Sequence, residues 1–458
     1  MVPIRYVILL TLFLLNGSPG SARGGVTDAS PAPGAQPFRS PPADTVLRVG
    51  PGHAYTSINA ALDAARYLDR AEGERIVVLI DPGDYEEMLY IDVPNVTLRN
   101  AAAAPDTELT NRGVNIGPGA VRVSSYYGHG YDYFSQGSHH RWDADTLAAN
   151  LRRGKLDAEN PTVGSTSGSY WSATVIVDTF GFRADHVIFE NSFNQYISRR
   201  ESRDSVVQWA EGGKGERPRD FGNTDVQDRA FVERAAAIAL TEKADRTVLN
   251  RCRVVGRQDS FFGAAGARVI VYRGVMMGAV DYLFGGMNAV FYQTDLMLNV
   301  SDAGHDRSYI TAAHYPRGRG MLFYECRIVS PQPGVETASA YGAKPGFFGR
   351  PWRPDSSEVV LYRTRIDTSS FPGAEGQSLV DPEGWKDSLG GRSPYMYEYA
   401  TEEQSGRSHT GQRAKWTSVP SAPFLADGLP IQPITFTAGG DDWNPLPGLL
   451  AADEQREP

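Results

Sequence analysis

Two similar stretches decide the fold: residues 256–263, Gly-Arg-Gln-Asp-Ser-Phe-Phe-Gly, and residues 278–285, Gly-Ala-Val-Asp-Tyr-Leu-Phe-Gly. Their aspartates, Asp259 and Asp281, are 22 residues apart, and so are the glycines that close the two stretches. Each stretch follows a run rich in β-branched and aromatic residues, which is typical of a strand. A period near 22 residues with a strand in each repeat indicates a β-solenoid, in which successive coils of the chain stack.

Stacked coils would bring the two aspartates together. Neighbouring strands lie about 4.8 Å apart, so one full period would place Asp259 and Asp281 side by side on one face. Two carboxylates at that distance are a recurring device in acid–base and nucleophilic chemistry. The repeat therefore predicts a candidate active site as well as a fold.

Short strand candidates recur along the chain, and no long helical pattern separates them. They include residues 76–80, 96–98, 173–177, 187–189, 237–240, 269–272, 290–292, 321–324 and 359–362. This all-β pattern favours a parallel β-helix over a sheet of alternating strands and helices. The uneven spacing indicates long loops at 124–170 and 197–233, which we expect on one face, where they would shape a cleft.

A helical pattern stands before the first strands. Apolar residues recur there at helical spacing: Ile58, Ala61, Leu62 and Ala65. Thr56 or Ser57 could cap such a helix at its N-terminus. We expect a short helix that caps the N-terminal end of the stack.

The two ends of the chain differ from its middle. Residues 1–22 combine a charged start, an apolar run and small residues, as in a secretory signal peptide. A membrane anchor is the alternative, although the apolar run is short for a bilayer. Residues 23–44 are rich in Pro, Gly, Ala and Ser, which predicts a disordered leader. We expect the β-helix to cover 45–447, a flexible tail at 448–458, and a secreted or periplasmic protein.

Composition narrows the range of partners. The chain has 458 residues, 41% of them hydrophobic, and a net charge of −9, which gives no general attraction to nucleic acid or to an anionic membrane. Cys252 and Cys326 stand at equivalent positions of different coils, too far apart for a disulfide. The spacing of the histidines does not indicate a metal site, and no glycine-rich loop indicates a nucleotide site. We therefore expect neither a metal nor a cofactor. We expect a monomer.

Four motifs, in this order, resemble the pectin methylesterases (pectinesterases, carbohydrate esterase family eight). They are Gly256–Ser260, Val280–Gly285, Tyr309–Ala313 and Phe348–Trp352. Weaker matches extend the likeness over roughly residues 47–445. The resemblance implies a right-handed, single-stranded parallel β-helix, in agreement with the repeat. It also implies a secreted enzyme that removes methyl esters from homogalacturonan and releases methanol.

The resemblance implies a role for each matching residue. Asp281 would be the nucleophile, and Asp259 the general acid that then acts as the base. Gln258 would donate an amide N–H to the oxyanion, and Arg350 would orient Asp281. Two carboxylates about 5 Å apart resist double ionisation. Since Arg350 would keep Asp281 charged, Asp259 would hold the proton. The substrate-binding residues expected in the cleft are Trp352, Thr174, Tyr282 and Phe284.

The sequence also departs from the family. Many members carry a second glutamine that helps to bind the oxyanion, and counting from Asp245 puts Ala236 in its place. Alanine has no donor, and the loss of one oxyanion donor can cost about 3 kcal/mol. Either a group from another loop substitutes or turnover is lower. His314 likewise stands where glutamine is common.

Several alternatives stay open. The protein could be an esterase or thioesterase with another acyl substrate, or a non-catalytic pectin-binding β-helix. The aspartates could be turn residues, Gln258 part of a side-chain ladder, Arg350 a surface ion pair and Trp352 part of the core. Gly128-His129-Gly130 looks like a polygalacturonase motif, but it lacks the matching pair of adjacent aspartates.

Overall fold

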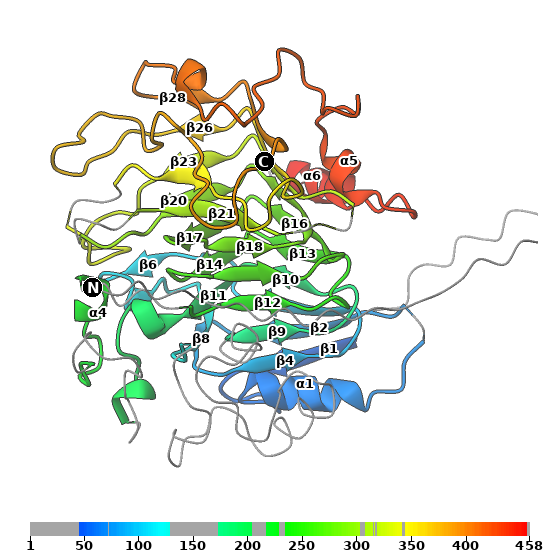
Figure 1. Cartoon of the computed structure of the whole chain (residues 1–458). Helices are drawn as coiled ribbons and strands as arrows, with labels where there is room; N and C mark the ends of the chain where they lie inside the picture. Colours follow the sequence, from blue (N-terminus) through cyan, green and yellow to red (C-terminus); the bar gives the residue numbers. More distant parts are fainter. Residues whose placement is uncertain are drawn as a thin grey trace, which may run out of the picture. The chain divides into compact units, whose positions relative to one another are not determined.

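The structure is a computed structural model (Figure 1). It describes residues 45–71, 73–128, 173–203, 217–228, 234–302, 307–314, 316, 318–340 and 344–455. The predicted signal peptide (1–22) and leader (23–44) lie outside these residues, as do most of the 124–170 loop and much of the 197–233 loop. The fold below is that of the described part of the unit Asp44–Pro458.

Three parallel sheets run along the stack (Figure 1). In the middle of the chain each coil contributes one strand to each sheet in turn, so that every third strand pairs. Thus β13 (Thr247–Asn250) pairs with β16 (Arg268–Tyr272), and β15 (Phe261–Gly263) pairs with β18 (Leu283–Gly285). This arrangement is a parallel β-helix and confirms the predicted fold class.

The sheets have ten, nine and seven strands. The ten-stranded sheet is ordered β1 (Thr45–Val49), β2 (Ile76–Ile80), β5 (Val96–Asn100), β10 (Arg183–Asp185), β13, β16, β19 (Asn288–Tyr292), β22 (Met321–Tyr324), β25 (Val359–Tyr362) and β27 (Met396–Tyr399). The nine-stranded sheet is ordered β3 (Gly83–Tyr85), β8 (Val121–Ser125), β11 (Val187–Asn191), β14 (Arg253–Val255), β17 (Val275–Gly278), β20 (Asp295–Leu298), β23 (Arg327–Val329), β26 (Arg365–Ile366) and β28 (Glu402–Glu403). The seven-stranded sheet is ordered β4 (Leu89–Ile91), β9 (Val175–Val177), β12 (Ile238–Leu240), β15, β18, β21 (Tyr309–Ala313) and β24 (Phe347–Gly349). A separate antiparallel pair is β6 (Leu109–Thr110) and β7 (Asn115–Ile116). Shorter helical segments are η2 (Ser192–Asn194), η3 (Glu201–Arg203), α4 (Asp225–Asp228) and η4 (Thr410–Gln412).

Side chains alternate between the interior of the stack and its outer surface. Phe261 and Leu283 are register partners in the seven-stranded sheet, and both are buried in the interior core. Phe262 and Phe284, one residue further along, pair on the other face with ring centroids 4.8 Å apart. Because successive residues of a strand point to opposite faces, this alternation decides which side chains can reach a ligand.

The connections with the most residues join the same two sheets. The chain segments 126–174 and 192–237 each join a strand of the nine-stranded sheet to a strand of the seven-stranded sheet, β8 to β9 and β11 to β12. In the next two coils, the connections between the same two sheets are short and consist of residues 256–260 and 279–282. These two short corners carry the aspartates.

The N-terminal end of the stack is capped by α1 (Ile58–Arg66), as predicted (Figure 1). The Ser57 hydroxyl accepts a hydrogen bond from the backbone N–H of Ala60 at 3.2 Å, which satisfies one free donor of the first turn. The helix is amphipathic and buries the four predicted apolar residues: Ile58, Ala61, Leu62 and Ala65.

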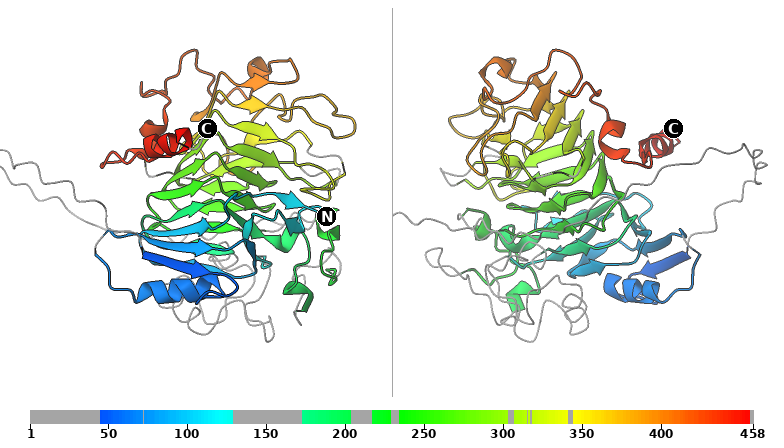
Figure 2. Two further views of the ribbon diagram at one scale, coloured as in Figure 1. Left: turned by 180° about the vertical axis from the view of Figure 1, so that it is seen from behind. Right: turned by 45° about the vertical axis from the view of Figure 1, so that its right-hand side comes forward.

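The C-terminal helices α5 (Pro433–Thr437) and α6 (Leu446–Glu454) lie along the outside of the ten-stranded sheet (Figure 2, red). They cover a column of stacked tyrosines, one from each of the last five strands of that sheet: Tyr272, Tyr292, Tyr324, Tyr362 and Tyr399. Leu446 and Leu449 of α6 are buried, and the Tyr272 hydroxyl donates to Asp453 at 2.7 Å.

The prediction of a flexible tail from residue 448 was therefore wrong for residues up to 455. The Leu-Pro-Gly-Leu-Leu start of α6 has weak helix propensity. Packing against the tyrosine column stabilises the helix instead, and this contact is invisible in the local sequence.

Both cysteines are buried and free, as predicted. Cys252 and Cys326 occupy the same turn, between the ten- and nine-stranded sheets, three coils apart. Among the described helices, none has the length and apolar character needed to cross a membrane.

Candidate active site

Asp259 and Asp281 occupy the same corner of successive coils. Each stands two residues before its strand, and those strands pair in register, Phe261 with Leu283. The backbone N–H of Asp259 donates to the carbonyl of Val280 at 3.1 Å, so the coils are also joined at the corner. Both aspartates adopt left-handed backbone angles, φ 58° and 50°. Aspartate enters this region more readily than most residues because its short polar side chain can hydrogen-bond locally.

The two aspartates line a pocket of about 260 Å³ outside the seven-stranded sheet. The residues that line it are Arg234, Gln258, Asp259, Asp281, Phe284, Ala312, Trp352 and Leu389. Five of the eight were predicted from the sequence: Gln258, Asp259, Asp281, Phe284 and Trp352. No group of side chains within the described ranges could hold a metal ion.

Arg350 binds the carboxylate of Asp281. Its Nε donates to one carboxylate oxygen at 2.8 Å, and its Nη2 donates to the other at 2.7 Å. The guanidinium lies over the ring of Tyr309, 4.1 Å from the centroid. Only 17% of the Arg350 side chain and 9% of the Asp281 side chain are exposed. The pair is therefore a largely buried bidentate contact and not a surface ion pair.

Burial raises the pKa of both carboxyl groups. For Asp259, burial is the main cause and the charge of Asp281 adds to it, so its pKa lies well above the usual range even though Arg234 and Arg350 oppose the rise. For Asp281, burial raises the pKa, and the hydrogen bonds and charge of Arg350 oppose this rise. The expectation that Arg350 favours ionised Asp281 agrees with these directions, but it left out the effect of burial on this carboxyl.

Trp352 forms one wall of the pocket. Its ring lies 5.9 Å from that of Phe284 and edge-on to that of His314 at 4.8 Å. The side chain is only half-buried, so Trp352 is not a core residue. His314 is held in turn, because its Nε2 accepts a hydrogen bond from Arg353 at 3.1 Å.

Two predicted substrate-binding residues do not reach the pocket. Thr174 is fully buried, and its hydroxyl lies 2.7 Å from the Ser125 hydroxyl and donates to the Glu190 carbonyl at 2.8 Å. Tyr282 is fully buried in the interior core. The prediction was wrong for both. Tyr282 follows Asp281 directly, but both residues stand in the corner before β18, where Asp281 has a left-handed backbone, and the Tyr282 side chain packs into the interior core.

The structure also changes which residue neighbours Gln258. Counting along the sequence put Ala236 in the position of the family's second glutamine, but Arg234 is the parallel register partner of Gln258. The backbone N–H groups of Ala237 and Ile238 both donate to the carbonyl of Ser260, at 2.8 and 3.2 Å. Two residues opposite one is the arrangement of a β-bulge, which shifts the register by one position.

Ala236 itself is covered. It is buried in an apolar cluster with Tyr126, Tyr127 and Phe193, and it does not line the pocket. The other residues that the sequence analysis missed are Ala312 and Leu389. Ala312 is the register partner of Phe284, so the pairing of β18 with β21 would have identified it. Leu389 comes from a distant loop and carries no sequence signal.

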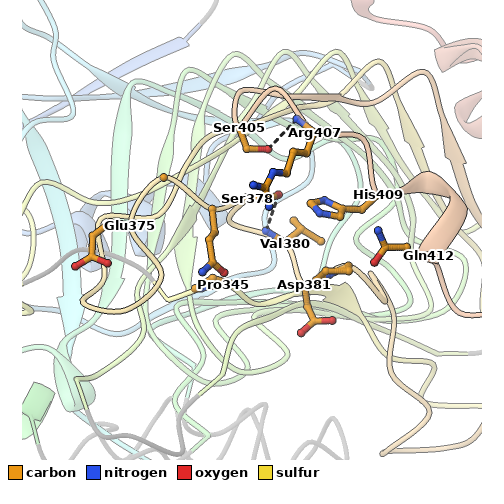
Figure 3. A pocket seen from close by; sticks show the side chains of 12 residues that line it. Pro345, Glu375, Ser378, Val380, Asp381, Ser405, Arg407, His409 and Gln412 are labelled. Atoms are coloured by element: carbon orange, nitrogen blue, oxygen red, sulfur yellow. Dashed lines mark hydrogen bonds between the residues drawn. The ribbon is translucent and has the colours of Figure 1, made fainter.

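A larger pocket opens near the C-terminal end of the stack (Figure 3). Its volume is about 700 Å³, and its lining is polar, with side chains from 375–382 and 405–412. It shares no residue with the pocket at the aspartates. His409 is the one histidine in its lining, and its Nδ1 lies 2.7 Å from the Glu403 carboxylate. The smaller pocket is the candidate active site because its two aspartates stand on successive coils of the stack and one of them is bound by Arg350 through two hydrogen bonds.

Comparison with known proteins agrees with this choice. Residues 215–426 match the family model described as Pectinesterase. This segment belongs to the pectinesterase family. The pectinesterase segment includes both aspartates, Gln258 and Arg350, and thus the whole set of residues that meet at the pocket.

One curated relative is probable pectinesterase A of Aspergillus fumigatus. It is 32% identical over 198 residues, which are 43% of this chain and 53% of that protein. The chain thus spans about half the length of such curated relatives.

Solved structures share the fold. Pectin methylesterase from carrot is 17% identical with a TM-score of 0.56, and the match covers 90% of this chain and 98% of that chain. A pectin methylesterase solved in complex with a hexasaccharide is 17% identical with a TM-score of 0.52, and the match covers 81% and 93% of the two chains. At this level of identity the likeness supports the parallel β-helix and nothing finer.

Proposed function

We propose that this protein is a carboxylic-ester hydrolase that removes methyl esters from homogalacturonan and releases methanol. The observation that carries the proposal is the unequal pair of buried aspartates, of which only Asp281 is held by Arg350 in two hydrogen bonds. The pectinesterase segment supports the reaction type. The hexasaccharide bound to a pectin methylesterase of the same fold supports an oligomeric sugar substrate.

In the first half of the proposed reaction, the Asp281 carboxylate attacks the carbonyl carbon of the methyl ester. Negative charge develops on the carbonyl oxygen, where the Gln258 amide N–H donates to it. The C–O bond to the methoxy group then breaks, and the leaving oxygen takes the proton of Asp259 and departs as methanol. An acyl-enzyme with an anhydride bond to Asp281 and an ionised Asp259 remain.

In the second half, ionised Asp259 takes a proton from a water molecule, which attacks the acyl carbon. The bond to Asp281 breaks, so Asp281 is again a carboxylate, and Asp259 is again protonated. The uronic acid releases its proton to solvent and leaves as a carboxylate. Overall, ester and water give acid and methanol, and the protein returns to its starting state.

The pKa directions support this division of roles. A general acid must hold a proton before the leaving group departs, and the pKa of Asp259 lies well above its usual range through burial and the charge of Asp281. A nucleophilic carboxylate must be ionised, and Arg350 opposes the rise of the Asp281 pKa that burial causes. The roles of the two aspartates are therefore not interchangeable.

The aromatic wall supports sugar binding. The half-buried ring of Trp352 stands next to the aspartates and presents flat apolar surface to a pyranose ring, while the buried ring of Phe284 packs beside it in the same wall. We therefore assign sugar contact to Trp352, with Phe284 supporting its ring. Export to the periplasm or the medium is part of the proposal and rests on residues 1–22.

The test is methanol release from methylated pectin by the wild-type protein and by Asp281→Asn. Asparagine tolerates the φ of 50° at this position, so the variant should fold. Asp442→Asn is the matched control, since Asp442 also has a left-handed backbone (φ 52°) but is exposed in the C-terminal segment.

We expect Asp281→Asn to lose methanol release while Asp442→Asn keeps it. Near-normal release by Asp281→Asn would refute the assignment of the nucleophile. A wild-type protein that hydrolyses a generic acyl ester but not methylated pectin would have another acyl specificity. Pectin binding without any methanol would identify a binding module.

A further inference from the structure

Arg234 lies beside Gln258 at the edge of the pocket. The two residues are parallel register partners on neighbouring coils. Register partners in parallel strands point to the same side and lie about 4.8 Å apart. Both residues line the pocket together with the two aspartates. The Arg234 side chain therefore runs alongside the amide that is assigned to the oxyanion.

The guanidinium of Arg234 is available to a ligand. The residue is exposed, and within the described part of the chain no hydrogen bond or ion pair engages its guanidinium. Arg350 differs, because its guanidinium is committed to both oxygens of Asp281. Of the two arginines at this site, one holds a catalytic carboxylate and the other is free to meet the substrate.

The chemistry of ester cleavage calls for such a group. Charge develops on the carbonyl oxygen in both tetrahedral intermediates, and donors aimed at that oxygen lower the barrier. The Gln258 amide is one donor. Ala236 can offer no side-chain donor, and it is covered by an apolar cluster. A guanidinium N–H forms charge-assisted bonds to an oxyanion that are about twice as strong as those of a neutral amide.

We propose that Arg234 is the second oxyanion donor of this site, where its guanidinium N–H donates to the ester carbonyl oxygen beside the Gln258 amide. The inference rests on the proposed ester hydrolysis and adds a catalytic residue to it. The β-bulge at Ala237 and Ile238 makes the role possible, because it brings residue 234 opposite Gln258. The site would thus have two side-chain donors for the oxyanion, and one of them would carry a positive charge.

The other use of a free arginine here is to bind the carboxylate of a neighbouring, de-esterified sugar. The two roles differ in kinetics. An oxyanion donor acts mainly in the transition state, so its loss lowers kcat. A group that binds a distant carboxylate equally in the ground and transition states affects KM and leaves kcat unchanged.

The experiment compares kcat and KM for methanol release from methylated pectin by wild type, Arg234→Ala, Arg234→Gln and Arg234→Lys. We expect Arg234→Ala to lose about 10²- to 10³-fold in kcat with KM changed by less than about threefold. Arg234→Gln and Arg234→Lys each keep an N–H donor, so both should retain more kcat than Arg234→Ala. Arg48→Ala is the control, an exposed arginine on β1 of the first coil, and it should match wild type.

Thermal unfolding of each variant separates folding from catalysis, and Arg234→Gln decides the question should Arg234→Ala fail to fold. A normal kcat in the folded variants would overturn the inference while leaving the proposed function intact. So would a rise in KM alone, which would make Arg234 a carboxylate-binding residue. A wild-type protein that releases no methanol would overturn both the proposed function and the inference.

Discussion

Replacing Arg350 with glutamine should move the acid side of the pH–activity profile to higher pH. In the proposed reaction Asp281 must be ionised, so activity should be lost as the pH falls through the pKa of this carboxyl. Burial raises that pKa and Arg350 opposes the rise. Without Arg350 the effect of burial stands unopposed. The acid limb must then shift upward.

The size of the effect follows from the two hydrogen bonds of 2.8 and 2.7 Å to a carboxylate that is 9% exposed. A hydrogen bond to a charged group stabilises by about 1.5–3 kcal/mol. A factor of ten corresponds to about 1.4 kcal/mol. We therefore expect kcat/KM on the acid limb to fall roughly tenfold to a hundredfold. At higher pH, where Asp281 is ionised in both proteins, the loss should be smaller.

The assay is initial-rate methanol release over a pH series. Arg327→Gln is the matched control, because Arg327 also donates through two nitrogens to one aspartate, Asp295, but this pair belongs to the nine-stranded sheet and over half of the Arg327 side chain is exposed. Arg327→Gln should leave the profile in place. If Arg350→Gln lowers kcat/KM by the same factor at every pH, Arg350 only positions Asp281, and the electrostatic reasoning above is refuted.

Three further predictions concern single side chains. The pKa of Asp259 is raised in the folded state by burial first and then by Asp281, so its contribution to stability is present at low pH and is lost as the pH rises. Asp259→Asn should therefore unfold at a higher temperature than wild type at neutral pH, with the difference closing below about pH 4, while methanol release falls by about 10²- to 10⁴-fold; equal unfolding temperatures at neutral pH would contradict this. Trp352→Ala should raise KM by roughly twofold to tenfold, because it removes an aromatic face worth about 0.5–1.5 kcal/mol, and a change confined to kcat would argue against sugar contact. The pKa of Asp453 is lowered overall, since hydrogen bonds and charge from Tyr272, Arg251 and Arg273 outweigh burial, so its stabilising effect is lost as the pH falls. Asp453→Asn should cost about 1 kcal/mol at neutral pH and nothing at low pH, with methanol release unchanged; thermal unfolding at both pH values is the check.

The fold could be predicted from the sequence because each coil of the solenoid repeats the same pattern of short strands and turns. The aspartates recur with the coil, so the spacing of Asp259 and Asp281 alone indicates that they stack. Arg350 and Trp352 lie far along the chain from the aspartates, and only the family resemblance connected them to the site. The prediction that the two aspartates meet thus rested on the repeat, and the predictions for Arg350 and Trp352 rested on the family resemblance.

The predictions that were wrong depend on structural details that the 22-residue repeat does not determine. A one-residue bulge decides that Arg234, and not the next residue Ala235, stands opposite Gln258. The backbone turn at the corner before β18 decides that Tyr282 points inward although Asp281 lines the pocket. Contacts between distant segments decide the rest, such as Leu389 at the pocket and α6 against the tyrosine column.

The two short corners, 256–260 and 279–282, have a consequence for how this scaffold can be altered. Four other connections between the same two sheets are longer, 126–174, 192–237, 299–308 and 330–346, and only 86–88 in the first coil is also short. Long connections thus lie on both sides of the coil that joins the aspartates, and none lies within it. One residue added between the two aspartates would break the 22-residue spacing that places Asp281 next to Asp259 in the stack. Engineering for new polysaccharides should graft loops at the long corners and leave the 22-residue coil at its present length.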